Sequence, residues 1–414
     1  MEKNKETAEG KERQELQRLY AETVPYLLQW YDYNRRILPW REDPTPYHVW
    51  VSEIMLQQTR VEAVKGYYDR FLTCLPDIAA LAAAEEEVLL KLWEGLGYYN
   101  RVRNMQKAAR VIMEAYGGEM PADYEGLRAL PGIGDYTAGA IASIAFGRSY
   151  PAVDGNVLRV MSRIACSEED ITKEQAKRKL KEDLTFAIPK RSGDFNQSLM
   201  ELGATVCLPN GKPLCEQCPV MHLCKAFHAG RETELPVKTG PKARRMENRA
   251  VYLVFYDGKV LLHRREKKGL LAGLWEFPNI LIENGKNKMT PAKAKAILEE
   301  LMPEGVECKA YKGQKAKHIF SHVEWHMEGI RIEVDAKRPA LNGMTSEERQ
   351  NGVSAAVRRA IRETMSRDAE DATEHASDWA FVTLQEVQEN YPIPSAFEAY
   401  LKELKQGTRS EAEK

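Results

Sequence analysis

The sequence lacks any long hydrophobic run. No stretch approaches the ~20 consecutive apolar residues that a membrane-spanning helix needs, which argues against a membrane protein. The first residues, MEKNKETAEGKERQE, are polar and have no apolar core of a secretory signal. We therefore expect a cytoplasmic protein with no membrane partner. There is also no internal repeat, so a solenoid is not indicated.

The sequence also lacks an excess of charge of either sign. Its 60 basic and 61 acidic residues give a net charge of −1, so bulk charge does not indicate a polyanionic partner. Any polyanion must be bound by local features such as backbone amides and helix N-termini. Hydrophobic residues make up 43% of the 414 residues, enough to bury real cores, and the length suggests two or three domains.

The spacing of apolar residues divides the chain into two parts. From about residue 16 to 230 the spacing is helical throughout, with short turns rich in Gly and Pro. The segment 231–247 lacks periodicity and contains two prolines, which predicts a linker. The period then changes to two, and RAVYLVFYDGKVLLHRRE predicts two strands joined at Asp257-Gly258. The expected fold is therefore multidomain, with an all-α domain followed by an α+β domain over 248–405.

Other segments of the second half have weaker signals. We predict further strands at His318–His326 and Gly329–Asp335, and helices near 291–302 and 384–405. The polar stretch 336–377 is interpreted as an inserted helical or disordered excursion. The predicted polar tails are 1–15 and 406–414.

A glycine-rich turn within the helical part predicts an anion site. In LPGIGDYTAGAI, residues 130–141, Gly132 and Gly134 form a tight hairpin, and a helix begins just after it. The hairpin amides and the helix N-terminus can together hold a phosphate without Lys or Arg. This pattern is typical of helix-hairpin-helix proteins that bind the DNA backbone, and the alternative is an ordinary corner between helices.

Four of the seven cysteines are crowded together. The spacing C-x7-C-x2-C-x5-C is typical of a metal site in a reducing compartment, and four thiolates in one short loop suit a 4Fe-4S cluster. Zinc stays an alternative, although the paired knuckles of most four-cysteine zinc sites are absent. The four residues are Cys207, Cys215, Cys218 and Cys224.

Two carboxylates are candidates for acid–base chemistry. Glu53 lies off the apolar stripe of its predicted helix and could face a cleft. Asp154 comes just before a helical run, where an Asp is most often an N-cap. A solvated glutamate and a capping aspartate are the simpler interpretations of each residue taken alone.

The motifs together resemble those of adenine DNA glycosylases, the MutY family. The resemblance runs from about residue 24 to 335 and resumes at Trp379. The first two cysteines are one residue further apart than is usual in the family. The motifs are, in chain order, LPWRxxxxPYxVWVSEIMLQQT, GLGYYxR, LPGIGxYTAGAI, VDGNVxR, FNQxLMxLG and the four cysteines.

The resemblance implies roles for residues in the helical part. Glu53 matches the general acid that protonates adenine, and Asp154 matches the carboxylate that stabilises the developing sugar cation. Tyr136 and Asn156 match residues of the family that orient the attacking group and hydrogen-bond the second carboxylate. Residues matching the adenine pocket are Trp40, Arg41 and Gln197, and residues matching those that contact the DNA or fill the gap left by the flipped base are Leu56, Gln58, Thr59, Tyr98, Gly132 and Gly134.

Position 136 separates two kinds of enzyme. Related endonuclease III enzymes have Lys there, whose amine forms a Schiff base and leads to strand cleavage. Tyr136 cannot form a Schiff base, so we expect a monofunctional glycosylase. The implied substrate is double-stranded DNA with adenine opposite 8-oxoguanine or guanine, bound by a monomer in the bacterial nucleoid.

The second domain resembles the Nudix-like module of the same family, including GLLAGLWEFP at 269–278. The Arg-Glu pair of a Nudix hydrolase is absent from AKAILEELMPEG, so we do not expect diphosphate hydrolysis. Phe320, Ser321 and His322 match the loop that recognises 8-oxoguanine, and the alternative is an ordinary edge strand with a turn.

Two other functions stay open on the sequence alone. One is a pyrimidine or mismatch glycosylase like endonuclease III, which Glu53, Tyr136 and the Phe-Ser-His run argue against. The other is a catalytically silent protein that binds damaged DNA. The pair Glu53 and Asp154 disfavours it only if the two carboxylates converge.

Overall fold

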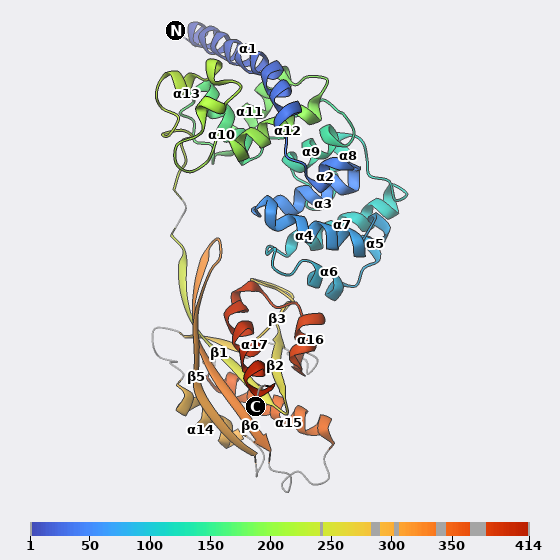
Figure 1. The fold of residues 1–414 in the computed structure, drawn as a ribbon, viewed down its shortest axis with the longest axis vertical. Coiled ribbons are helices and arrows are strands. Elements are labelled where there is room, and N and C mark those ends of the chain that lie inside the picture. The colour runs from blue at the N-terminus through green and yellow to red at the C-terminus, as the bar shows by residue number, and fades with distance from the viewer. Residues whose placement is uncertain are drawn as a thin grey trace. The chain divides into compact units, whose positions relative to one another are not determined.

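The chain folds into two units in the computed structural model, which describes residues 2–240, 243–282, 290–301, 306–336, 345–364 and 378–412 (Figure 1). The first unit contains residues 1–84 and 100–241, and the second contains 85–99 and 242–414. Among the described residues, no helix is long and apolar enough to cross a membrane.

The first unit is helical, as predicted. One of its cores is formed where α1, α10, α11 and α12 pack together, with Leu27, Val160 and Leu199 buried at the centre. The helices are α1 (Glu2–Asn34), α2 (Pro39–Glu42), α3 (Pro46–Leu56), α4 (Val61–Cys74), α5 (Ile78–Ala83), α7 (Asn100–Ala115), α8 (Tyr124–Ala129), α9 (Asp135–Ile144), α10 (Gly155–Ala165), α11 (Glu174–Ala187), α12 (Ser192–Thr205) and α13 (Lys225–His228), with short 3-10 turns at Cys215–Gln217 and Met221–Leu223.

The predicted hairpin lies between α8 and α9. Gly132 has a φ of +78°, a left-handed conformation that glycine adopts at little cost. A Cβ there would also lie 2.6 Å from the Cβ of Asn104. Gly134 occupies the N-cap position of α9, with no side chain bonded to the first-turn amides. The chain therefore turns sharply and enters α9 with its amides available.

A second glycine allows α9 to approach the segment that precedes α10. A Cβ on Gly139 would lie 2.5 Å from the Pro151 carbonyl oxygen, closer than packed atoms come. The same segment is held by Asn196, whose amide oxygen accepts from the Ala152 N–H at 3.0 Å and whose nitrogen donates to the Tyr150 carbonyl at 2.8 Å. These contacts fix the backbone three residues before Asp154.

The polar tail predicted over 1–15 is wrong, because α1 begins at Glu2. Arg13 donates to Asp183 on α11 at 2.7 Å, so this end of the helix is attached by charged contacts instead of apolar ones. Hydropathy gives no signal for such an attachment.

The second unit is built on a seven-stranded mixed sheet with the central order β3-β2-β1-β6-β5, while β4 pairs with β1 and β7 with β2. β1 and β6 run parallel, and the other pairs are antiparallel. The predicted hairpin at Asp257-Gly258 is confirmed by the β1–β2 register. The strands are β1 (Arg245–Tyr256), β2 (Lys259–Arg264), β3 (Trp275–Glu276), β4 (Asn279–Ile282), β5 (Val306–Ile319), β6 (Val323–Ala336) and β7 (Trp379–Val382).

Both faces of the sheet are buried. Alternate residues of β1 contribute to opposite cores: Tyr252 to the core covered by α14 (Pro291–Leu301) and α15 (Ser346–Thr364), and Leu253 to the core covered by α16 (Leu384–Glu389) and α17 (Glu398–Ala412). This arrangement explains why β1 is apolar at every position from Ala250 to Tyr256 instead of at every second one. The segment 85–99, with α6 (Glu86–Leu92), belongs to the same unit: Lys91 on α6 donates to the Val387 and Tyr391 carbonyls.

The strand predicted over His318–His326 is wrong, because the chain turns at Phe320–His322 between β5 and β6. The Phe320 N–H donates to the Val323 carbonyl at 2.9 Å, which closes the turn. Apolar and aromatic residues on both sides of the turn continue the strand pattern, so periodicity alone does not detect it.

Two other predicted boundaries differ from the structure. Within the linker predicted over 231–247, Leu235 is buried and its carbonyl accepts from Arg163, while β1 already begins at Arg245. Within 336–377, α15 confirms the helical alternative, but it buries Val353 and Val357 in the core of the sheet, so this part is integral to the domain and is not an excursion. The remainder of that stretch, 337–344 and 365–377, lies outside the described residues.

Candidate active site

A cleft of about 1330 Å³ opens in the helical unit. Its walls come from α2, α3, α9, α10, α11 and α12 and the turns before them. Twelve residues singled out in the sequence line it: Trp40, Arg41, Glu53, Leu56, Gln58, Thr59, Gly132, Gly134, Tyr136, Asp154, Asn156 and Gln197. Segments more than 150 residues apart in the sequence therefore converge as expected.

Glu53 is a buried carboxyl in the wall of this cleft, with a side chain carried by α3. α3 begins at Pro46 after Thr45, whose hydroxyl accepts from the His48 N–H at 3.2 Å. Burial raises the pKa of Glu53 to about 7. The charge of Asp154 acts in the same direction, while Tyr136 and Arg41 oppose it.

Tyr136, in the first turn of α9, donates its hydroxyl to Glu53. Burial raises the pKa of Tyr136 well above its usual value, so the phenol keeps its proton. Its hydroxyl also lies 3.7 Å from the Met200 sulfur on α12. The phenol is therefore fixed as a donor to a carboxyl that titrates near neutral pH.

Asp154 is the N-cap of α10 and faces the cleft at the same time. One oxygen accepts from the Val157 N–H at 2.7 Å and the other from the Asn156 amide at 2.8 Å. Burial raises the pKa of Asp154, but these hydrogen bonds oppose the rise. The capping interpretation and the functional one are thus compatible, because capping orients the carboxylate and stabilises its ionised form.

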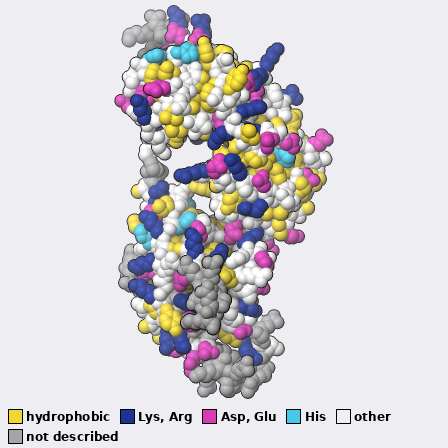
Figure 2. All heavy atoms as spheres, viewed as in Figure 1, with side chains coloured by type: hydrophobic (Ala, Val, Ile, Leu, Met, Phe, Trp, Pro, Cys, Tyr) yellow, Lys and Arg dark blue, Asp and Glu magenta, His cyan; other side chains and the backbone are white. Residues whose placement is uncertain are grey.

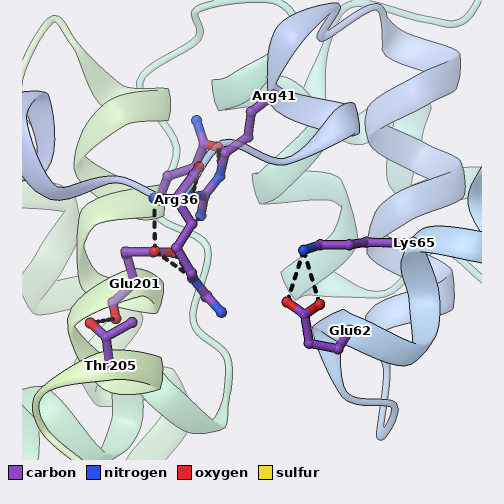
Figure 3. A network of polar contacts seen from close by, with 7 residues as sticks. Arg36, Arg41, Glu62, Lys65, Glu201 and Thr205 are labelled. Atoms are coloured by element: carbon purple, nitrogen blue, oxygen red, sulfur yellow. Dashed lines mark hydrogen bonds and ion pairs between the residues drawn. The ribbon is translucent and has the colours of Figure 1, made fainter.

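Two arginines, Arg36 and Arg159, and a glutamate, Glu201, support these groups and were missed in the sequence. Arg159 on α10 donates to the Asn156 side chain at 2.9 Å and to the Gly203 carbonyl at 2.7 Å. Glu201 on α12 accepts from Arg36 and Arg41 (Figure 3). Arg36 is outside the motifs; Arg159 and Glu201 lie within them, but spacing does not indicate which side chains they contact.

The hairpin next to the cleft leaves both glycines exposed. An acidic residue, Asp135, follows directly and would repel an anion at the N-terminus of α9. Its carboxylate is paired with Arg128 at 2.8 Å and accepts from the Tyr124 hydroxyl at 3.0 Å. These partners reduce the repulsion, so the amides of the hairpin can still hold a phosphate.

Gln58 and Tyr98 share an unusual backbone conformation, with φ values of 58° and 48°. Non-glycine residues rarely adopt it and often do so at functional sites. Gln58 follows α3, and the end of that helix is held by Arg101, which donates to the Ile54 and Gln57 carbonyls at 2.6 and 2.8 Å. Tyr98 is half exposed and belongs to the second unit, unlike the other predicted DNA contacts near the cleft.

The turn at Phe320–His322 lies in the second unit. Ser321 and His322 are exposed, with the serine oxygen 3.2 Å from the histidine Nδ1. Phe320 packs edge-on against the buried Trp325, with ring centroids 4.8 Å apart. The Arg245 N–H at the start of β1 donates to the His322 carbonyl at 3.1 Å. The turn thus exposes two polar side chains, and its backbone and Phe320 are held in place by contacts with β1 and Trp325.

The four clustered cysteines line one small, mostly apolar cavity. Burial raises the pKa of Cys218 to about 12, and the other thiols oppose its ionisation further. Arg163 lies 3.2 Å from the sulfur of Cys207. In the part of the chain that the structure describes, no three His, Cys, Asp or Glu side chains are arranged to hold a metal ion.

Comparisons with known proteins identify both domains. Residues 51–185 match the HhH-GPD superfamily of base excision DNA repair proteins, and residues 250–403 match the NUDIX domain. Both halves of the predicted fold are therefore confirmed. Among solved structures, a thermostable thymine-DNA glycosylase is 29% identical, with a TM-score of 0.46 over 54% of this chain and 99% of that one.

Two full-length relatives identify the family. An adenine DNA glycosylase of Mus musculus is 37% identical over 398 residues, which cover 81% of this chain and 76% of the mouse protein. That of Homo sapiens is 36% identical over 402 residues, which cover 81% of this chain and 72% of the human protein. The chain therefore belongs to the adenine DNA glycosylase (MutY) family of base excision repair enzymes.

Proposed function

We propose that this adenine DNA glycosylase removes adenine opposite 8-oxoguanine or guanine in double-stranded DNA, with Glu53 as the general acid and Asp154 as the carboxylate that stabilises the sugar cation. The observation that carries the proposal is the environment of Glu53: a buried carboxyl with a pKa of about 7 that shares a cleft with a second, hydrogen-bonded carboxylate.

The chemistry needs two carboxyl groups in different protonation states. Adenine is a poor leaving group until its ring is protonated, and a carboxyl with a pKa near 7 can hold a proton at neutral pH and donate it. As the bond between C1′ and N9 breaks, the electron pair leaves with the protonated base and positive charge develops on the sugar. Water then adds to C1′ and returns a proton to the acid.

Asp154 is suited to face that positive charge. The Val157 N–H and the Asn156 amide both donate to its carboxylate, so the ionised form is favoured in spite of burial. When two carboxyl groups share a cleft, repulsion between their negative charges disfavours the doubly ionised pair, so the pair retains one proton. Since Asp154 is the better hydrogen-bonded of the two, the proton belongs on Glu53.

Base recognition is assigned to the end of the cleft lined by Trp40, Arg41 and Gln197. Trp40 packs edge-on against Tyr68, with ring centroids 5.4 Å apart, and can offer an apolar wall to a flipped purine. Arg41 and Gln197 are bonded to each other at 3.1 Å and have polar atoms left for the base. Tyr136 supplies a phenol where a Schiff-base enzyme needs an amine, so release of the base should not be followed by strand cleavage.

We assign recognition of the base opposite adenine to the NUDIX domain. Ser321 would hydrogen-bond the oxidised edge of 8-oxoguanine, with Phe320 and His322 in support. The exposure of Ser321 on a turn fixed by Trp325 supports this role. The hairpin at Gly132 and Gly134 would hold the DNA backbone, and Leu56, Gln58, Thr59 and Tyr98 would contact the distorted duplex.

The four cysteines fit a 4Fe-4S cluster, which the family typically binds. The four residues line one cavity, and Cys218, whose pKa burial raises to about 12, would bind iron as a thiolate, while Arg163 lies beside the sulfur of Cys207. When bound, the cluster would cross-link the loop 207–224 and hold it against α10.

Replacement of the proposed acid gives the first test. We expect Glu53→Gln to reduce single-turnover release of adenine by at least about 10²–10⁴-fold while the duplex is still bound, because the amide cannot donate a proton in the same way. The control is Glu182→Gln, which neutralises an exposed carboxylate on α11 outside the cleft. Adenine release by Glu53→Gln at the parent rate would remove the acid assignment.

The pH dependence follows from the same group. Because the acid must be protonated, kcat/KM should fall as pH rises through about 7. Tyr136→Phe removes a hydrogen bond that stabilises ionised Glu53, so the alkaline limb should move to higher pH even if the rate drops. A limb at the same pH in both proteins would mean that another group titrates.

Replacement of the serine in the β5–β6 turn tests recognition of the opposite base. We expect Ser321→Ala to reduce the preference for adenine opposite 8-oxoguanine over adenine opposite guanine by about 5- to 150-fold, equivalent to ~1–3 kcal/mol. Ser395→Ala, which changes an exposed serine of the same domain, is the control. An unchanged ratio would show that the partner base is recognised elsewhere.

Elemental analysis tests the cluster. We expect about four irons and four acid-labile sulfides per chain, as a 4Fe-4S cluster requires, and loss of both in Cys218→Ser. Cys74→Ser should retain them, since this exposed cysteine lies outside the cavity. One equivalent of zinc and no sulfide would contradict the assignment.

A further inference from the structure

Glu201 is a fully buried carboxylate at the arginine-rich end of the cleft, and it takes no part in the proposed proton transfer. One oxygen accepts from the Arg36 backbone N–H at 3.1 Å and from Arg36 Nε at 2.6 Å, and the other accepts from Arg36 Nη2 at 3.0 Å and Arg41 Nη2 at 2.8 Å. Figure 3 shows both guanidinium groups directed at this one carboxylate. Burial alone would raise the pKa of Glu201, but the two arginines lower it, so the group stays ionised.

Arg41 is held on three sides. Besides Glu201, its Nε donates to the Gln197 side chain at 3.1 Å and its Nη1 to the Arg36 carbonyl at 3.1 Å. A guanidinium has five N–H donors, so two are left once these three bonds are made. The Arg41 side chain lines the cleft and is 14% exposed. The network thus fixes a planar cation in the wall of the cleft and leaves two of its N–H donors outside these bonds.

The network also reaches Glu53 through the charge of Arg41. Glu53 is faced by Tyr136 from α9, Asp154 from the start of α10 and Arg41 from α2. Among them Arg41 is the cation, and its charge favours the ionised form of Glu53. Two guanidinium groups against one carboxylate leave a single net positive charge. Without Glu201 that charge would double, and the proposed acid would lose its proton more readily.

We propose that Glu201 is a positioning residue for the glycosylase reaction: it holds Arg41 against the flipped base and balances its charge, so that Glu53 keeps the proton it must donate. This inference rests on the proposed role of Glu53. A purely structural ion pair is a weaker explanation, because buried ion pairs contribute little net stability compared with apolar residues of similar size.

Two variants of opposite sign test the proposal. Glu201→Gln keeps the size of the side chain and removes the negative charge, so the alkaline limb of kcat/KM should move to lower pH by on the order of half a unit to one unit. Arg36→Met removes a positive charge and leaves Glu201 paired with Arg41, so the limb should move to higher pH. A purely structural role would lower the rate equally at every pH, and the alkaline limb of each variant would stay at the parent pH.

The controls separate failure of this inference from failure of the proposed function. Glu182→Gln changes charge by the same amount on an exposed surface and should leave the limb unmoved. If Glu201→Gln does not fold, as judged by circular dichroism, Arg36→Met alone still tests the direction in which the alkaline limb moves. Limbs that coincide in parent, Glu201→Gln and Arg36→Met would overturn the inference, while the acid assignment would stand as long as Glu53→Gln is inactive.

Discussion

The structure depends on keeping an ionisable carboxyl out of water in the wall of a cleft. Burial of Glu53 raises its pKa to about 7, whereas an exposed glutamate would be almost fully ionised at neutral pH and useless as an acid. Burying such a group costs free energy unless its polar atoms are bonded. The surrounding elements therefore have to provide a donor and still leave one side of the carboxyl open to a base.

That requirement explains contacts that look purely architectural. Gly139 has no side chain because α9 must approach the backbone near Pro151, and Asn196 bonds that same segment from α12. Together they fix the position of Asp154 relative to Tyr136, since one precedes α10 and the other begins α9. The visible face in Figure 2 mixes Lys and Arg with Asp and Glu, in keeping with the net charge, so placement of single groups matters more than overall charge.

The fold class could be predicted from the sequence, because helical spacing, the change of period and the Asp257-Gly258 turn are local signals. The convergence of Glu53 with Asp154 could be inferred only through the family resemblance, since no local pattern encodes contacts across 100 residues. Two predictions failed for physical reasons, and a third, the helix within 336–377, was right about the helix but wrong about its burial. Arg13 attaches α1 by charge, Phe320 continues a strand pattern through a turn, and α15 hides its apolar stripe in a polar stretch. Glu201 was missed because an acidic residue in a helix gives no sign of which arginines it meets.

The acid is tuned by opposing effects, of which burial is the largest. Burial and the charge of Asp154 favour the neutral form of Glu53, while the Tyr136 hydroxyl and Arg41 favour the ionised form. A much higher pKa would make Glu53 too weak an acid to protonate adenine. A much lower pKa would leave Glu53 ionised at neutral pH, with no proton to donate. A tyrosine suits this position because its own pKa is far above that of Glu53, so it donates a hydrogen bond without competing for the same proton. A lysine would add a positive charge and hold Glu53 ionised, which favours nucleophilic attack by an amine over protonation of the base. The choice of residue at position 136 therefore sets both the protonation state of the acid and the class of reaction that the cleft can support.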